Sequence, residues 1–464
     1  MPEIEMVDLY RLSYANPGQR AHVAWQSFLG ERLRTRAKEA ACFVAKRVRD
    51  PEYVKEMVEI AKKQSIYPSI WSPTDLASGD VGLALMYSYI DACFPGQGWD
   101  AFTQQYLRSA AAETQRSTLI FPGLFAGTAG LAFTLSQVNQ GGTRYQKTLA
   151  SVHKGLCSQV LAQSWWRSEL ERGVASNDFD LISGAAGILA YLVSIEQADQ
   201  TIQQTIAHLL TYLMWLGEPG QLCGQERWYI PPTLLPNEVH RQFFPHGNFN
   251  CGLAHGIPGP LAALSLTWLA GYRAPGLHET IAYLADWVAG HRVEQEWGID
   301  WPDSVPLESA ATAQEWQHLP PTRAAWCYGA PGVSRSLWLA GCALENDELL
   351  QMGQAGIEAV LRRNIPQRGI PSPILCHGIA GLLQICLRFA QECESELVKA
   401  QIPALVEQLL EIFDPSAPLG FRDTEQGVPR DHPGWLSGAP GIAMVLLAAS
   451  TNVAPTWDRV LALA

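Results

Sequence analysis

A Gly-x-x-Gly motif followed by a short apolar run recurs seven times along this chain of 464 residues. The first glycines of successive copies lie 48, 57, 72, 73, 49 and 60 residues apart, which leaves room for two helices and two loops in each unit. Self-similarity at such a period indicates one supersecondary unit used repeatedly. The copies begin at Gly79, Gly127, Gly184, Gly256, Gly329, Gly378 and Gly438.

The segments between the motifs are of two kinds. Leu149, Val152, Leu156 and Val160 follow helical spacings of 3, 4 and 4, which predicts an amphipathic helix. The runs directly after the glycines, such as residues 188–192, are apolar on nearly every face, as expected of helices enclosed on all sides. One outer and one inner helix per unit, with no strand-like alternation, predicts an all-α fold: an α/α toroid, a double ring of helices in seven repeats. An open solenoid is less favoured, because the inner helices lack the polar stripe of a concave face.

The repeats bear on the domain organisation. Length alone suggests two or three domains, but motifs running from residue 79 to residue 441 predict a single domain over residues 1–464. Residues 1–70 precede the first motif and are expected to form N-terminal helices. Glycine at the start of each inner helix allows the backbones to approach closely and to adopt positive φ in the preceding turn.

Composition restricts the partners and the compartment. The chain is 47% hydrophobic and 17% charged, with a net charge of −12 and no block of basic residues, so nucleic acid is not an expected partner. Residues 1–6 lack the pattern of a secretion signal, and no apolar stretch reaches the roughly 20 residues that cross a bilayer. Ten cysteines without a Cys-x-x-Cys pair favour a reducing compartment. We therefore expect a cytoplasmic protein.

Residues that bind metals stand just before two of the glycine motifs. Cys327 and Cys376 occupy the same slot of copies five and six, and His377 follows Cys376 directly. Equivalent slots of neighbouring repeats lie side by side, so these three side chains should meet. Two thiolates and one imidazole suit Zn²⁺, and three protein ligands leave a fourth position open, as in catalytic sites. We expect one zinc ion per chain, in a thiolate-rich site better suited to activating a thiol than to hydrolysing an amide.

Three further residues approach the same rim. His255 stands directly before Gly256, without a cysteine beside it, and is free to act as an acid or base. Arg323 lies four residues before Cys327, and Asp180 lies four residues before the glycine of copy three. They could form a pair that orients His255 or the substrate, or they could be ordinary surface charges.

The longest stretches between motifs fall within residues 188–328 and predict the walls of a binding cleft. His240, His246 and Cys251 lie in them as spare ligands. Loop packing is the preferred interpretation of all three.

Three segments carry a resemblance to a known family. Residues 254–256 (Ala-His-Gly), 323–329 (Arg-Ala-Ala-Trp-Cys-Tyr-Gly) and 376–378 (Cys-His-Gly), on a scaffold of seven Gly-x-x-Gly motifs, resemble the lanthionine synthetase C family of lanthipeptide cyclases. The resemblance implies an α/α toroid that holds one zinc ion and binds a dehydrated precursor peptide. A cysteine thiolate of that peptide adds to the β-carbon of dehydroalanine or dehydrobutyrine and closes a thioether ring.

The resemblance also implies roles for individual residues. Cys327, Cys376 and His377 match the zinc ligands of the family, and His255, Arg323 and Asp180 match its active-site residues. The match of Asp180 is the weakest, because Asp178 is only two residues away. The zinc would lower the pKa of the substrate thiol, the thiolate would attack, and the enolate would then be protonated at its α-carbon. His255 is the candidate for this proton transfer.

The resemblance also implies partners, and it leaves rival functions open. About 70 residues before the first motif are too few for a dehydratase domain, so we expect a free-standing cyclase served by a separate dehydratase and an exporter, with membrane association only through such partners. One rival is a related zinc protein that uses glutathione or another small thiol. A zinc prenyltransferase is a second, opposed by the two aligned cysteines because those enzymes use an Asp-Cys-His set. A toroid that binds peptides without catalysis is the third.

Overall fold

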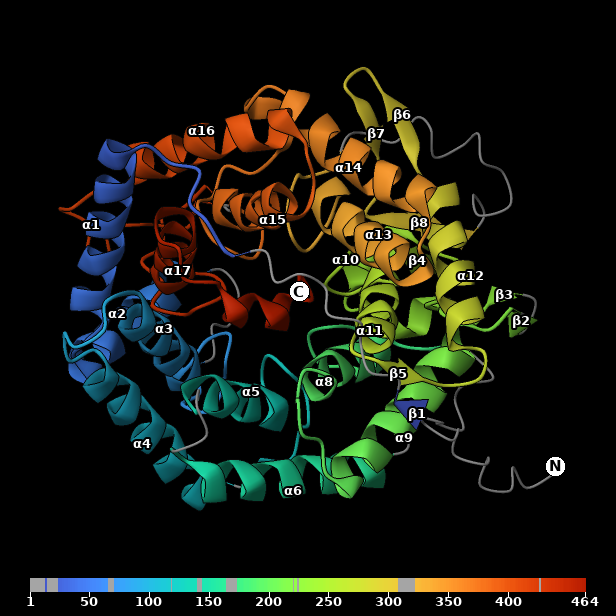
Figure 1. Cartoon of the computed structure of the whole chain (residues 1–464), viewed down its shortest axis with the longest axis horizontal. Helices are drawn as coiled ribbons and strands as arrows, with labels where there is room; N and C mark the ends of the chain where they lie inside the picture. Colours follow the sequence, from blue (N-terminus) through green and yellow to red (C-terminus); the bar gives the residue numbers. More distant parts are fainter. Residues whose placement is uncertain are drawn as a thin grey trace.

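The computed structural model describes residues 13–14, 24–65, 71–117, 119–139, 144–163, 173–219, 221–222, 225–307, 322–424 and 427–464. Its helices form two concentric rings (Figure 1). The predicted α/α toroid is confirmed. The helices before residue 70 are α1 and α2, and most of residues 1–23 lie outside the described part of the chain.

The inner ring contains the seven helices that begin at the glycine motifs. They are α3 (Asp80–Cys93), α5 (Thr128–Val138), α8 (Ala185–Leu192), α11 (Pro258–Leu269), α13 (Ala330–Leu344), α15 (Ile379–Glu392) and α17 (Ala439–Ser450). Each packs on the next, and α17 packs on α3 to close the ring. Every residue of α8 and α17 is buried, which accounts for their uniformly apolar sequences.

The outer ring contains one helix behind each inner helix. Six follow their inner partners along the chain: α4 (Asp100–Arg116), α6 (Gln146–Ala162), α9 (Gln200–Gly217), α12 (Leu277–Gly290), α14 (Asp347–Arg362) and α16 (Glu396–Ile412). The seventh place is taken by α1 (Glu31–Arg47), which packs on α17. The Trp25 indole N–H donates to the Ala448 carbonyl at 2.9 Å beside this contact. The chain is thus closed by its first long helix lying against its last, with α2 (Pro51–Gln64) following.

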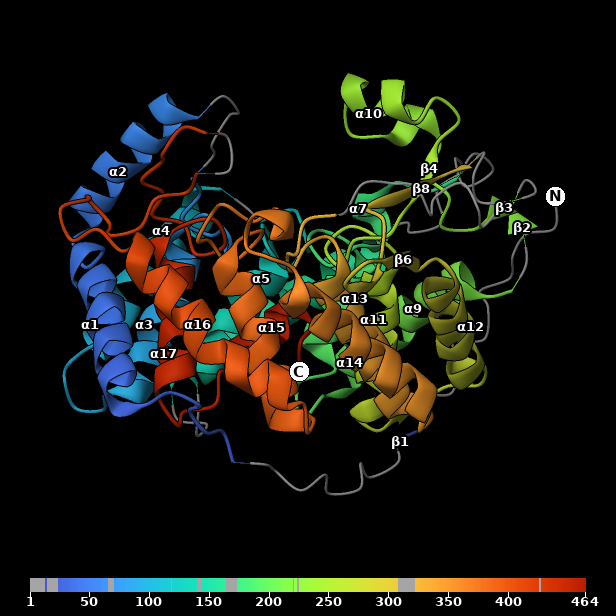
Figure 2. The ribbon, with the colours of Figure 1, turned by 90° about the horizontal axis from the view of Figure 1, so that it is seen from above.

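The remaining described elements are short. The helices α7 (Ser176–Phe179) and α10 (Glu238–Phe243) lie before α8 and α11, and 3₁₀ turns cover Pro232–Leu234, Pro366–Arg368 and Thr456–Leu461. Four antiparallel strand pairs join β1 (Ser13–Tyr14) to β5 (Tyr272–Arg273), β2 (Gln221–Leu222) to β3 (Gln225–Glu226), β4 (Asn248–Asn250) to β8 (Ser304–Pro306) and β6 (Val293–Gln295) to β7 (Gly298–Asp300). Most of them lie in the long stretches of copies three to five, and α10 stands above the rings (Figure 2).

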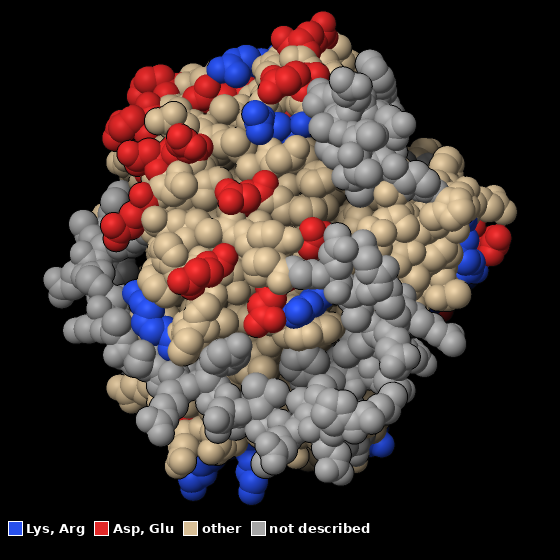
Figure 3. All heavy atoms as spheres, turned by 90° about the vertical axis from the view of Figure 1, so that its right-hand side faces the viewer, with Lys and Arg blue, Asp and Glu red and all other residues tan. Residues whose placement is uncertain are grey.

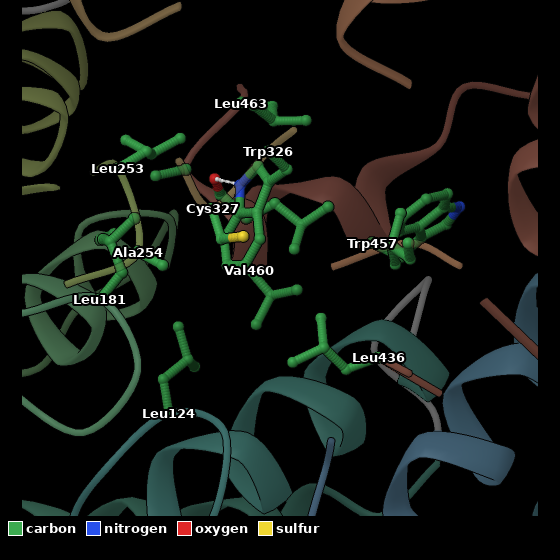
Figure 4. Close-up of a cluster of buried hydrophobic side chains, with 14 of the residues drawn as sticks. Leu124, Leu181, Leu253, Ala254, Trp326, Cys327, Leu436, Trp457, Val460 and Leu463 are labelled. Carbon is green, nitrogen blue, oxygen red and sulfur yellow. Dashed lines mark hydrogen bonds between the residues drawn. The ribbon is translucent and has the colours of Figure 1, made fainter. Parts of the chain in front are cut away.

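The last residues of the chain fill the middle of the inner ring. The Trp326 indole N–H donates to the Leu461 carbonyl at 3.0 Å, and the Arg335 guanidinium donates to the Leu463 carbonyl. Figure 4 shows Trp326 and Cys327 among apolar side chains that include Val460 and Leu463. The toroid therefore has a packed centre, and the glycine loops rest on it.

Close approach explains the glycines better than positive φ does. At Gly378 an added Cβ would lie 2.2 Å from the Ser372 carbonyl oxygen, so no side chain fits there. Of the seven first glycines, only Gly329 has a positive φ, +89°. In the other six copies close approach, the first of the two expected reasons, accounts for the glycine. Within the described residues, no helix is long and apolar enough to cross a membrane.

Candidate metal centre

The loops that carry the glycine motifs are joined edge to edge by backbone hydrogen bonds. The bonds run from Ala77 N to Phe125 O, Phe125 N to Ile182 O, Leu181 N to Ala254 O, Ala254 N to Cys327 O, Cys327 N to Cys376 O, Cys376 N to Leu436 O and Leu436 N to Ala77 O, at 3.0 to 3.3 Å. Apart from Leu181, these are the residues two places before each first glycine. The alignment of the seven slots is therefore confirmed, and Cys327 and Cys376 are direct neighbours.

The three predicted metal-binding side chains meet at this rim. The ligand atoms of Cys327, Cys376 and His377 all lie within 4.8 Å of one another. Cys327 is buried, and the other two are half-buried. Among the described residues this is the one group of three or more His, Cys, Asp or Glu side chains compact enough to hold a metal. Zinc ligands about 2.0–2.3 Å from the metal lie roughly 3.5–3.8 Å apart in a tetrahedron, so the group needs little adjustment to close around an ion.

Electrostatics favour the thiolate form in this cluster. The pKa of Cys327 is lowered to about 5, because the Cys376 thiol and the His377 ring hydrogen-bond to its thiolate and outweigh the opposing effect of burial. The charges of His377 and Arg323 act in the same direction. The inner helices α13 and α15 each begin three residues after one of these cysteines, and helix N-termini stabilise negative charge. The site is therefore prepared for a cation.

His255 is held by Asp180. His255 Nδ1 lies 2.6 Å from Asp180 Oδ2, and the two side chains are 40% and 1% exposed. Burial lowers the pKa of His255, but the hydrogen bond and charge of Asp180, together with the charge of Cys327, raise it above its ordinary value. The pKa of the histidine is thus raised while its ring stays accessible from the rim.

The structure separates Asp180 from Asp178. Asp180 Oδ1 accepts the backbone N–H groups of Ser183 and Gly184 at 2.8 and 2.9 Å, which fixes the carboxylate. Asp178 Oδ2 instead accepts the Ala175 N–H at 3.1 Å at the start of α7. Of these two carboxylates, the one that the sequence singled out is the one that contacts His255.

Arg323 stands near the cysteines. Its charge lowers the pKa of Cys327, and it also opposes the effect of burial on Asp303, which raises the pKa of that carboxyl to about 6. The sequence suggested that Arg323 and Asp180 might pair. The structure instead shows a contact of Asp180 with His255, and the charge of Arg323 acts on Cys327 and Asp303.

Sequence reasoning gave no role to Tyr328 or Asn250. The Asn250 Nδ2 donates to the Tyr328 hydroxyl at 3.0 Å, and the rings of Tyr328 and His255 have centroids 6.3 Å apart. Burial raises the pKa of Tyr328, so its hydroxyl keeps its proton. Tyr328 occupies the same slot as His255 and His377, directly before a first glycine, and that position could have identified it.

The spare ligands are not part of the cluster. The Cys251 Sγ is buried against the Phe249 carbonyl at 3.6 Å. His240 interacts with Asn237 at the start of α10, and the His246 carbonyl accepts the Tyr229 hydroxyl. Their preferred interpretation as loop packing agrees with these contacts.

Comparisons with known proteins agree with the fold. The family described as "Lanthionine synthetase C-like protein" matches residues 70–462. The nisin biosynthesis protein NisC of Lactococcus lactis subsp. lactis is 23% identical over 359 residues, covering 76% of this chain and 83% of that protein. A solved structure of nisin cyclase superposes with a TM-score of 0.75 at 22% identity, covering 89% of this chain and 97% of the other.

Proposed function

The chain belongs to the lanthionine synthetase C-like family, and from this premise we propose that it is a zinc-dependent lanthipeptide cyclase. It would add cysteine thiols of a peptide to dehydroalanine or dehydrobutyrine residues of the same peptide and so form thioether rings. One observation carries the proposal: a Cys-Cys-His group and a His–Asp pair lie together on one rim of the toroid.

Cys327, Cys376 and His377 would hold the zinc. Their donor atoms are soft or borderline, they lie within 4.8 Å of one another, and their number leaves a position for a substrate. When bound, zinc lowers the pKa of a thiol that shares its coordination sphere while thiolate ligands keep that sulfur nucleophilic.

His255, held by Asp180, would transfer the proton in this reaction. The addition forms a bond between sulfur and the β-carbon and breaks the carbon–carbon double bond, so the proton lost by the thiol is matched by one gained at the α-carbon. A histidine whose pKa is raised by Asp180 holds a proton more firmly than a free histidine and is suited to this transfer. Asp180 would orient the ring, and Arg323 would stabilise negative charge beside Cys327.

The exposed apolar side chains favour a polypeptide substrate over glutathione. Among the described residues the exposed large hydrophobics are Ile120, Phe121, Leu161, Val239, Phe243, Ile365 and Val428. All lie on or at the entry to connections that run from an outer helix to the next inner helix, the connections that carry the glycine loops. A peptide is long enough to bury such apolar side chains when it binds, whereas a tripeptide thiol has little apolar surface to pair with them.

The surface charge is also consistent with a peptide. On the face shown in Figure 3, the Lys and Arg side chains of the described residues form separate small groups, and Asp and Glu gather at the upper left. The net charge is −12. A polyanion has no evident docking surface on this face.

Mass spectrometry of a dehydrated peptide tests the proposal and separates the nucleophiles. After incubation with the protein, ring formation leaves the peptide mass unchanged and removes thiols that react with an alkylating reagent. Glutathione addition instead raises the mass by one glutathione for each dehydro residue consumed. Unchanged mass with every thiol still reactive would contradict both activities.

Other parts of the proposal concern the setting of the enzyme. We propose that residues 1–464 form one domain, since α1 completes the ring that α17 ends. A separate dehydratase would supply the substrate, and an exporter would remove the product. A cytoplasmic location is supported by the described cysteines, which are free thiols.

A further inference from the structure

A buried ion pair lies behind the loop of copy five. Arg363 Nη2 is 2.7 Å from Asp300 Oδ2, and the two side chains are 0% and 1% exposed. Asp300 ends β7, and Arg363 follows the last residue of α14. Burying two charges costs about as much as their attraction returns, so such a pair is weak evidence for stability. Its contacts indicate another use.

The pair holds Thr322 from both sides. The Thr322 hydroxyl lies within hydrogen-bond distance of Asp300 Oδ1, at 3.1 Å, and of the Trp301 carbonyl, at 3.0 Å, and the Thr322 backbone N–H donates to Asp300 Oδ2 at 3.4 Å. Arg363 Nη1 donates to the Thr322 carbonyl at 2.9 Å. The Asp300 carboxylate thus contacts the donor groups of Thr322, and the Arg363 guanidinium donates to its carbonyl. Thr322 directly precedes Arg323 in the chain.

The other side of Arg323 is held as well. The Ala324 N–H donates to the Arg368 carbonyl at 2.7 Å, and the Arg368 side chain is buried, with Nη2 donating to the Leu361 carbonyl at 3.1 Å. A Cβ at Gly369 would lie 3.5 Å from the Arg323 Cα. The backbone is therefore held on both sides of Arg323, and this fixes the point from which its half-buried side chain extends.

Copy seven offers a comparison. His432 stands six residues before Gly438, as Arg323 stands six before Gly329, and each has its carbonyl oxygen 2.0 Å from the Cβ position of that glycine. An ion pair between the buried Asp423 and the partly exposed Arg430 also precedes His432. The loop of copy seven carries neither a cysteine nor a tyrosine in the rim slots.

We propose that the Asp300–Arg363 pair is a positioning device for Arg323: by holding Thr322, it fixes where Arg323 stands in the loop that leads to Cys327. The inference rests on the proposed function, because it gives Arg323 a task in the reaction. Asp300 and Arg363 lie behind the loop and would act only through it.

A paired substitution tests the device without leaving a buried charge alone. Asp300→Leu combined with Arg363→Met removes both charges together, a change that proteins often tolerate. We expect hydrogen exchange of the amides in residues 322–328 to rise at least about tenfold, with α5 and α8 unchanged. Zinc content should stay at the wild-type level. The kcat/KM for ring formation should fall roughly 10- to 100-fold, as when a supporting contact is lost.

A double-mutant cycle separates positioning from general destabilisation. In an Arg323→Ala background, the paired substitution should lower kcat/KM by less than about threefold further, because no guanidinium is left to position. The matched control is Asp423→Leu with Arg430→Met, which removes the ion pair of copy seven and should change kcat/KM less than about twofold. If the paired variant does not fold, Arg363→Lys replaces it, because this variant keeps the charge but lacks the two-pronged donor of arginine. It should show the same rise in hydrogen exchange in residues 322–328.

An equal loss in the wild-type and Arg323→Ala backgrounds would overturn the proposal, as would unchanged hydrogen exchange in residues 322–328. The exchange measurement does not depend on turnover. If the wild-type protein forms no rings, the proposed function fails, and the exchange result still decides whether the ion pair holds the loop.

Discussion

Asp180 contacts His255 with one carboxylate oxygen and its own loop with the other. Oδ2 lies 2.6 Å from His255 Nδ1, while Oδ1 accepts the N–H groups of Ser183 and Gly184. Asp75 stands at the equivalent place in copy one, four residues before Gly79, and repeats only the second role, accepting the N–H groups of Ala77 and Ser78. The chain therefore contains a natural control for the contact with His255.

Asp180→Asn should reduce ring formation much more than Asp75→Asn. Both variants keep an oxygen that can accept the loop N–H groups, but only the first removes a charge that orients His255 and favours its protonated form. We expect kcat to fall roughly 10² to 10⁴-fold for Asp180→Asn and to stay within about twofold for Asp75→Asn. Steady-state kinetics on one dehydrated peptide provides the comparison. Equal losses in the two variants would mean that Asp180 matters only to the loop.

The contact should also appear in the pH dependence of stability. Because Asp180 raises the pKa of His255 above 6.5 in the folded protein, it contributes stability below pH 6.5 that is lost as the pH rises through the folded pKa. Asp180→Asn should therefore cost most stability near about pH 5.5 and less above the folded pKa. Chemical unfolding across this range measures the difference, and an NMR titration should show a lower pKa for His255 in the variant. A cost that is the same at every pH would exclude the linkage.

Asp75 should show a pH effect of its own. Burial raises its pKa from 3.8 to about 6, in spite of the N–H groups that it accepts. Between these values the folded protein holds more protons than the unfolded chain, so stability falls as the pH rises from about 4 to 6. Asp75→Asn should remove that part of the decline. Unfolding curves of the variant that run parallel to those of the wild type would contradict the raised pKa.

Gly329→Ala should damage the site, because this glycine has φ of +89° and an added Cβ would lie 2.0 Å from the Arg323 carbonyl oxygen. We expect a loss of at least about 2 kcal/mol in the free energy of unfolding, together with weaker metal binding at Cys327. Gly155 is the matched control, since it lies exposed within α6 with nothing near its Cβ position. Gly155→Ala should stabilise the protein by about 0.5–1 kcal/mol. Thermal unfolding with zinc analysis tests both, and a neutral Gly329→Ala would contradict the close approach.

Much of the rim could be predicted from the sequence, because the glycine motifs align residues that the fold makes neighbours. Cys327 and Cys376 are an example: they are 49 residues apart, and a backbone hydrogen bond joins them. His255 was located in the same way. A repeat therefore converts sequence spacing into spatial adjacency.

Other features depend on contacts that no local pattern carries. Nothing in residues 31–47 indicates that α1 completes the outer ring behind α17. The choice between Asp178 and Asp180 depends on a short turn after α7, and the setting of Arg323 depends on Asp300 and Arg363, which are distant in the chain. Such relationships follow from closure of the ring and from pairing between separate connections.

The central claim is that Cys327, Cys376 and His377 hold zinc with a position left for a substrate thiol. X-ray absorption at the zinc edge, with the metal content measured on the same sample, tests it most directly. The account predicts about one zinc per chain, bound by two sulfurs and one imidazole with a light atom in the fourth position, and a third sulfur when a cysteine-containing peptide is added. Cys376→Ala should lose the zinc, whereas His255→Ala should keep it and form no rings. A folded wild-type protein that binds no zinc, or a sulfur count that does not change with peptide, would contradict the claim.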